Sequence, residues 1–229
     1  MFKFNSVNFS KESKFFKKIG LPILGSQLVM YAMTTTDYIM AGLYSSNDLA
    51  GVGLGASIFS PLYFLTAGVM FGVAPIIAQH YGAKEFDKIL SVVSYGIVRA
   101  VIITTISVLL FFVLASNILP IFSTNLLVID IGVTYLKIII LAYPAVGISV
   151  ICSRVCQALG QGIPLLITTI TRVILLTAPM SYYFYLIGKP IEWVWYSQVF
   201  AILIAAVISY FWMRFYFAKF NIVRSQLKS

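Results

Sequence analysis

The chain has 229 residues, of which 60% are hydrophobic and only 10% are charged. A soluble domain of this length cannot cover so much apolar surface, so the composition excludes one and indicates an integral membrane protein. The formal net charge of +9 does not indicate nucleic-acid binding, because the basic residues lie at the ends of apolar runs rather than along one polar face.

Hydropathy predicts six membrane-spanning helices. About 20 apolar residues suffice to cross the hydrocarbon core of a bilayer, and the connections between the predicted spans are short. We therefore expect an all-α integral membrane protein, a bundle of six transmembrane helices in which sequential neighbours pack together. The predicted spans, in chain order, are Ile19–Leu43, Leu49–Gln79, Val92–Ser116, Ile129–Cys152, Pro164–Ile187 and Trp193–Phe217.

The chain ends are predicted to be cytoplasmic. A basic segment covers residues 1–18 and a tail covers residues 218–229, on either side of the predicted lobe at residues 19–217. The loops on the opposite side carry a single basic residue, Lys189, and the positive-inside rule then places both termini in the cytoplasm. The basic residues on the predicted inner side are Lys3, Lys11, Lys14, Lys17, Lys18, Lys84, Lys88, Arg154, Arg214, Lys219, Arg224 and Lys228.

Prolines and glycines predict local departures from straight helices. Pro61 and Pro75 lie in the second span, Pro144 in the fourth and Pro179 in the fifth. Each removes a backbone donor and favours a kink, and broken helices are common in transporters. Small residues in the second span permit close helix contact, namely Gly51, Gly53, Gly55 and the Gly68-x-x-x-Gly72 pair.

Aromatic residues cluster near both predicted membrane surfaces, as in the interfacial belts of membrane proteins. The predicted inner belt contains Trp212, Phe215 and Tyr216. The predicted outer belt contains Tyr182, Tyr183, Tyr185, Trp193, Trp195 and Tyr196.

Asp37 is the acidic residue that falls well inside a predicted span. An ionisable group at that depth costs at least a few kcal/mol on insertion scales, roughly 2.5–3.5 kcal/mol at the helix centre, so it indicates an ion, proton or cationic-substrate site. Two structural interpretations stay open. The carboxylate could tie α-helical neighbours together, or it could lie close enough to the outer interface to stay hydrated.

The depths of the other intramembrane ionisable groups suggest a partner for Asp37. At 1.5 Å per residue, Asp37 lies about 9 Å and Lys137 about 12 Å below the outer ends of their helices. We hypothesise that Asp37 alternates between protonated and charged states with Lys137 and Tyr135 tuning it; the alternative is a permanent Asp37–Lys137 ion pair. Arg172 enters from the cytoplasmic end and is expected to lie too far from Asp37.

Further polar residues are candidates to line the same cavity, although threonine side chains also bond their own helix backbone. These candidates are Gln27, Thr34, Thr36, Arg172 and Gln198.

Several stretches carry a resemblance to a known family. The segment TTTDYIMAGLYSSNDLAGVGLGASIFSP at Thr34–Pro61 contains an Asp-x-x-x-x-Gly, a short loop ending in Leu-Ala and a small-residue helix start. It resembles the beginning of the multidrug and toxic compound extrusion (MATE) family. Further matches in the family's order are GVAPIIAQHYGAKEFDKI at Gly72–Ile89, YLKIIILAYP at Tyr135–Pro144 and QALGQGIP at Gln157–Pro164.

The resemblance implies a fold and a function. Family members have twelve helices in two six-helix lobes, and they export organic cations and drugs in exchange for inward Na⁺ or H⁺. The resemblance thus implies one lobe, similar to the N-terminal one, of a multidrug efflux antiporter in the cell membrane, with a coupling ion and no other cofactor. Because the chain is one lobe long, we expect transport to need a homodimer or a second six-helix lobe.

The fifth predicted span departs from the family. Many members carry asparagines and an acid there that share the cation site with the acid of the first helix, whereas this chain has Arg172. Two alternative functions therefore stay open. Lys137 with Arg172 is compatible with a flippase for lipid-linked oligosaccharides, and the chain could also be a truncated remnant that does not transport.

The sequence gives no sign of an enzyme. The acids are scattered, and the two that lie close together, Glu85 and Asp87, fall in a basic loop, so no catalytic constellation is predicted. Cys152 and Cys156 are interpreted as small packing residues rather than metal ligands, because the chain has no other Cys and a single His.

Overall fold

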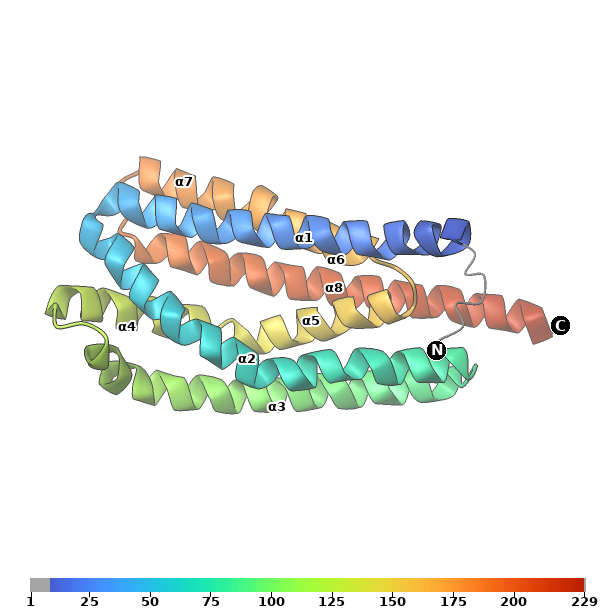
Figure 1. The fold of residues 1–229 in the computed structure, drawn as a ribbon. Coiled ribbons are helices and arrows are strands. Elements are labelled where there is room, and N and C mark those ends of the chain that lie inside the picture. Colours follow the sequence, from blue (N-terminus) through green and yellow to red (C-terminus); the bar gives the residue numbers. More distant parts are fainter. Residues whose placement is uncertain (1–8, 229) are drawn as a thin grey trace, which may run out of the picture.

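The computed structural model describes the backbone of residues 9–228, which form helices joined by short connections (Figure 1). Residues 1–8 of the predicted basic segment and Ser229 of the predicted tail lie outside the described residues. No strand occurs within 9–228. The prediction of an all-α bundle is confirmed.

The first three predicted spans lie within single long helices. These are α1 (Phe9–Tyr44), α2 (Ser46–Gly82) and α3 (Phe86–Ile118), and a 3₁₀ turn, η1 (Leu119–Ile121), follows. Ser45 separates α1 from α2 and caps the second helix, since its hydroxyl accepts a hydrogen bond from the backbone N–H of Asp48 at 3.0 Å.

The fourth predicted span is broken into α4 (Leu126–Ile140) and α5 (Tyr143–Ala158). The two helices meet at an angle of 48°. Pro144 lies in the first turn of α5, where its missing N–H is tolerated, but its ring prevents α5 from continuing the helix that precedes it. The expected break at Pro144 is therefore present.

The fifth predicted span is continuous but changes its winding. It consists of α6 (Ile163–Ile170), the π-helical segment η2 (Thr171–Thr177) and α7 (Ala178–Leu186). Pro179 is the second residue of α7, two positions after the end of η2. Its ring conflicts with the carbonyl four residues earlier, so the wider i→i+5 winding relieves that conflict. The last helix, α8 (Glu192–Lys228), contains the sixth predicted span.

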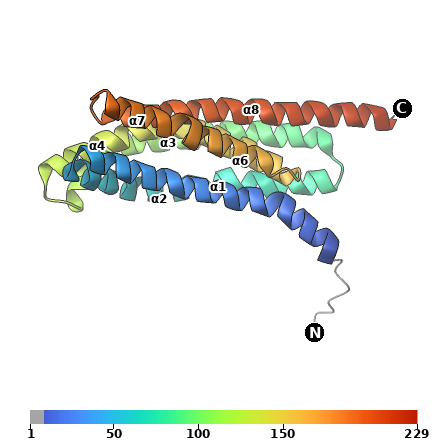
Figure 2. The ribbon, with the colours of Figure 1, turned by 90° about the horizontal axis from the view of Figure 1, so that it is seen from above.

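The helices run back and forth along one long axis. In Figure 1 the start of α1 and the end of α8 lie at the same end of the bundle, together with the α2–α3 and α5–α6 connections. The α1–α2, η1–α4 and α7–α8 connections lie at the other end. Helix α1 packs against α2 and α6, and α8 packs against α5 and η2. Figure 2 shows the same elongated bundle from above.

The outer surface of the bundle is apolar. Large side chains that are more than 60% exposed include Leu109, Val113, Phe211 and Phe215, a surface that suits lipid rather than water. Among the described residues, Asp87–Ile121, Ile163–Leu186 and Glu192–Ala218 are long and apolar enough to cross a membrane, and α4 with α5 adds a fourth span if the bent pair counts as one. The full count of six spans and the cytoplasmic ends stay predictions.

Glycines bring α2 and α4 into backbone contact. A Cβ atom built on Gly51 would lie 2.4 Å from Cγ2 of Ile131, and one on Gly132 would lie 3.0 Å from the carbonyl oxygen of Gly51. Without a hydrophobic drive between helices in lipid, such close contact is a main source of association. The predicted contact is thus present at Gly51, whereas Gly68 and Gly72 meet nothing within 4 Å.

The α2–α3 connection is held by an exposed charge cluster. Glu85 accepts a hydrogen bond from Nζ of Lys88 at 2.8 Å and lies 2.7 Å from Nδ1 of His80. The hydrogen bond from Lys88 and then that from His80 hold the pKa of Glu85 below its usual range. His80 thus belongs to a charge cluster at the α2–α3 end of the bundle.

We expect the substitution Gly51→Ala to destabilise the bundle by about 1–3 kcal/mol, because the new methyl group overpacks the α2–α4 contact. Gly53→Ala on the same helix is the matched control, since a Cβ there meets nothing within 4 Å. Thermal unfolding in detergent measures both variants. Equal melting temperatures would contradict the packing argument.

Candidate functional site

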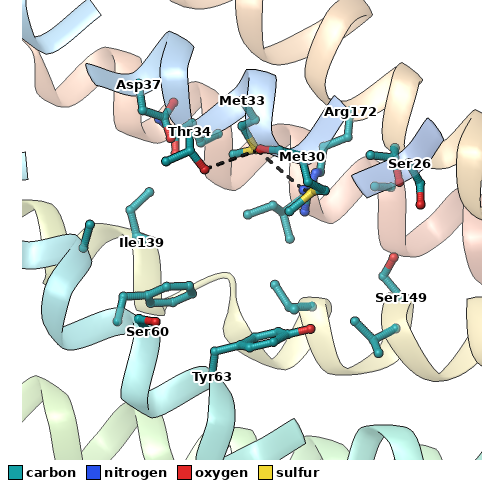
Figure 3. A pocket seen from close by; sticks show the side chains of 18 of the residues that line it. Ser26, Met30, Met33, Thr34, Asp37, Ser60, Tyr63, Ile139, Ser149 and Arg172 are labelled. Atoms are coloured by element: carbon teal, nitrogen blue, oxygen red, sulfur yellow. Dashed lines mark hydrogen bonds between the residues drawn. The ribbon is translucent and has the colours of Figure 1, made fainter. Parts of the chain in front are cut away.

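A cavity of about 590 Å³ lies between two groups of helices. Its walls come from α1, α6, η2 and α8 on one side and from α2, α4 and α5 on the other (Figure 3). A volume of roughly 300–1,000 Å³ with a largely apolar lining and few polar groups is typical of small-molecule sites. The polar groups of this cavity therefore decide what it can bind.

Asp37 of α1 lies at one end of the row of labelled cavity side chains (Figure 3). Its Oδ1 accepts a hydrogen bond of 2.8 Å from Nε2 of Gln198, which is buried in α8. An amide donor partly compensates a carboxylate removed from water without neutralising it. Asp37 and Gln198, both predicted from the sequence, are thus brought together by α1 and α8.

Tyr135 of α4 lines the same cavity as Asp37. Its ring makes an edge-to-face contact with Trp195 at 5.4 Å between centroids. Trp195 is only 2% exposed, so its prediction as an outer-belt residue was wrong. It instead packs against Tyr135 inside the bundle, because the face of α8 that carries Trp195 points toward α4.

Arg172 of η2 also lines the cavity. It therefore shares the cavity with Asp37, but no salt bridge within 4.0 Å joins the two side chains, so the structure shows no direct pair between them. The hydrogen bonds of the Arg172 guanidinium go to the thioether sulfurs of Met30 and Met33, and its Nε is buried without a partner.

Lys137 does not reach the cavity. Its ammonium lies over the ring of Phe112 in α3, 5.3 Å from the centroid, and it is absent from the lining. Two residues rotate an α-helix by about 200°, so Lys137 points away from the side of α4 that carries Tyr135. The predicted Asp37–Lys137 pair is therefore absent, and Arg172, rather than Lys137, shares the cavity with Asp37.

The remaining candidates divide by helix face. Gln27 and Thr34 line the cavity, as predicted. Thr36 does not, and its hydroxyl donates to the carbonyl oxygen of Ala32 at 2.9 Å. That bond is the local helix contact that the sequence left open as an alternative, and it leaves Thr36 without a role in the cavity.

Several lining residues were missed in the sequence. Tyr63 of α2 and Ser149 of α5 lie across the cavity from Arg172 (Figure 3). Arg154 was assigned to a loop because the fourth span was predicted to end at Cys152. In the structure it lies inside α5, and its guanidinium lies 4.4 Å from the ring centroid of Phe71. Its position four residues before Ala158, the end of α5, is beyond what hydropathy can resolve, since boundaries err by several residues.

The cavity offers no cluster of metal ligands. Within the described part of the chain, no group of three or more His, Cys, Asp or Glu side chains could hold a metal ion. Cys152 and Cys156 are buried in the core formed by α2, α3, α5 and α8. They fill that core, which agrees with their interpretation as packing residues.

Comparison with known families assigns the chain. The profile of the MatE family matches residues 22–183, which is more than half of the sequence. The chain belongs to the MatE family. The matched range contains Asp37, Tyr135 and Arg172, so the cavity described above is built largely from MatE-family sequence.

MatE-family relatives with curated names are multidrug resistance proteins. The chain is 32% identical over 177 residues to "Probable multidrug resistance protein NorM" of Listeria monocytogenes, an alignment that covers 77% of this chain and 38% of NorM. It is 30% identical over 164 residues to "Multidrug resistance protein PmpM" of Pseudomonas aeruginosa, covering 72% of this chain and 34% of PmpM. The chain spans less than half of these relatives.

Solved MATE structures share the fold. A MATE protein in the bent conformation superposes with a TM-score of 0.87 at 18% identity, covering 97% of this chain and 49% of that one. The Vibrio cholerae MATE transporter VcmN in the bent form gives a TM-score of 0.84 at 19% identity, covering 97% and 50%. The described bundle is therefore a helical membrane bundle with the fold of about half of a MATE transporter.

The contact between Asp37 and Gln198 predicts an energetic coupling between α1 and α8. In a double-mutant cycle of Asp37→Ala and Gln198→Leu, each of which removes the hydrogen bond, we expect a coupling of about 0.6 kcal/mol, with ~1.7 kcal/mol as the upper range for hydrogen bonds between membrane helices. Thermal unfolding in bicelles measures it.

The matched cycle pairs Asp37→Ala with Lys137→Met. Because Lys137 lies on Phe112 rather than in the cavity, this second cycle is expected to show additive effects. A coupling with Lys137 as large as that with Gln198 would contradict the geometry.

Proposed function

We propose that this chain is part or all of a secondary active transporter that exports small organic compounds across the cell membrane in exchange for Na⁺ or H⁺. The observation that carries the proposal is an ionisable carboxylate, Asp37, on the wall of a 590 Å³ cavity in a chain of the MatE family. Intramembrane acids that face a cavity are the usual sites of proton or ion coupling.

The surroundings of Asp37 fit a coupling site. Gln198 donates to Oδ1, and Tyr135 lines the same cavity. Neither group carries a charge that neutralises the carboxylate, which leaves it free to bind a proton or a Na⁺ ion. Arg172 lines the cavity as well, and repulsion between its positive charge and the bound ion would keep that binding reversible.

The names of the relatives support drugs or other small organic molecules as substrates. NorM and PmpM are named as multidrug resistance proteins, and the cavity volume matches a compound of that size. The family resemblance and the acid Asp37 suggest organic cations. The cell membrane is the expected location, and no enzymatic step is proposed.

A flippase for lipid-linked oligosaccharides is the alternative. The sequence supported it with Lys137 and Arg172, but Lys137 lies outside the cavity while Arg154 and Arg172 line it. Two arginines therefore keep this function open as a second candidate. A remnant without transport activity is the third possibility, and a transport assay separates it from the others.

We further propose that transport needs a second six-helix lobe, supplied by a homodimer or by another chain segment. The solved MATE chain in the bent conformation is about twice as long as the part that this chain covers. Two lobes inserted in the same direction would reproduce that arrangement.

The substitution Asp37→Asn is expected to abolish gradient-driven transport, because an amide can neither take up a proton nor balance the charge of Na⁺. Purified protein in liposomes is given an imposed Na⁺ or pH gradient. Movement of a fluorescent cation, ethidium, and of a fluorescent anion, fluorescein, is recorded in parallel.

The control variant is Lys137→Gln, which changes an intramembrane charge outside the cavity and is expected to leave the gradient dependence intact. If Asp37→Asn transported with an unchanged dependence on both gradients, the coupling role of Asp37 would be wrong.

Cross-linking in native membranes tests the need for a second lobe. We expect a covalent dimer, or a cross-link to another membrane protein, after treatment with an amine-reactive reagent. Transport by liposomes that each contain no more than one copy of the purified chain would contradict this part of the proposal.

A further inference from the structure

We propose that the cavity binds amphipathic organic compounds through an anionic group, a carboxylate or a phosphate ester, that pairs with Arg172. This inference rests on the transport function proposed above and changes its substrate class, since the family resemblance implies organic cations. The argument starts from the charges on the cavity wall.

The ionisable side chains that line the cavity carry a net positive charge. Asp37 is the acid among the lining residues, and Arg154 and Arg172 are the bases. Charges at membrane depth are costly and normally pair with each other or face a water-filled cavity. With Asp37 ionised, one positive charge remains without a counter-charge on the cavity wall, and protonation of Asp37 leaves two.

Asp37 is not placed to neutralise Arg172. No salt bridge within 4.0 Å forms between them, and Oδ1 of Asp37 is already engaged by Gln198. The guanidinium of Arg172 instead donates to the sulfurs of Met30 and Met33. A thioether is a weak, uncharged acceptor, so these contacts orient the guanidinium without balancing its charge.

The donor capacity of Arg172 is incomplete. Its Nε is buried and has no hydrogen-bond partner. A guanidinium presents donors in a planar fork that matches a carboxylate or a phosphate with two parallel bonds. Met30 and Met33 have flexible side chains that can move aside for such a ligand.

A second arginine lines the same cavity. Arg154 of α5 stacks its guanidinium over the ring of Phe71 at 4.4 Å and donates to Gln157 at 3.0 Å. Tyr63 lies across the cavity from Arg172, and Asp37 lies at one end of the row of labelled side chains (Figure 3). The two arginines thus add positive charge to one cavity from α5 and η2.

The remaining wall suits an aromatic body. Helix α2 supplies aromatic side chains that line the cavity beside the two arginines, and these present ring faces and edges to a bound compound. The aromatic lining residues of α2 are Phe59, Tyr63, Phe64 and Phe71. A ligand with an anionic group at Arg172 and an aromatic body against α2 would contact both the guanidinium and these aromatic rings.

The test is equilibrium binding of matched probes to the full chain in detergent, measured by isothermal titration. The probes share a naphthalene body: the anion 2-naphthoate, the neutral 2-naphthamide and the cation 2-naphthylmethylammonium. We expect 2-naphthoate to bind about tenfold more tightly than 2-naphthamide, the difference that a charged hydrogen-bonded pair produces, and the cation to bind most weakly.

Arg172→Gln is expected to remove the preference for 2-naphthoate, and Arg172→Lys to restore part of it. The matched control is Arg99→Gln, because Arg99 is exposed on α3, over the ring of Tyr95, and does not line the cavity. A preference of the unmodified chain for the cation, or equal losses in Arg172→Gln and Arg99→Gln, would overturn the proposal.

Nanodiscs distinguish a soluble anion from a lipid headgroup. If adding phosphatidylglycerol to phosphatidylcholine discs weakens the binding of both 2-naphthoate and the uncharged 2-naphthamide to the unmodified chain, a lipid headgroup occupies the site; if binding of 2-naphthamide, which the surface charge of the disc does not repel, is unchanged, the natural ligand is a soluble anion. Both outcomes support the anion site. The binding measurement involves no ion gradient. A negative result for the anion site is therefore separate from a failure of the proposed transport function, which Asp37→Asn tests.

Discussion

The need to satisfy backbone hydrogen bonds inside a lipid bilayer shapes this bundle more than any single contact. In lipid each peptide group must find its partner within the helix, and irregular backbone is tolerated only where it is buried in protein or borders a cavity. The two interruptions follow that constraint. The break between α4 and α5 lies within three residues of Ile139, and the π-helical segment η2 contains Arg172. Both Ile139 and Arg172 line the cavity.

Close packing of α2 on α4 explains how the cavity keeps its shape. Gly51 and Gly132 let the two backbones touch, and Gly55 leaves room for the ring of Tyr135. Trp195 then supports that ring from α8. The aromatic wall beside Asp37 is therefore fixed by contacts among three helices, while the methionines that contact Arg172 remain adaptable.

The polar groups of the site show how far pattern reasoning reaches. Asp37 could be singled out because an acid in an apolar run carries a large cost, and Gln198 because amides are rare in such runs. Their pairing across 161 residues could not be deduced, since depth along a helix does not give rotation around it. The same limit explains the error at Lys137, which matches Asp37 in depth but faces α3.

Hydropathy and local motifs were sufficient for the helical membrane class, the order of the helices, the proline break and the MatE family, because each depends on residues close together in the chain. The charge of the cavity was decided by packing. Widening of the helix before Pro179 and the rotation of α4 and α5 determined that Arg154 and Arg172, rather than Lys137, line it. A helix's face toward its neighbours is a property of the assembled bundle, and the Asp37 site acquired its cationic neighbour only there.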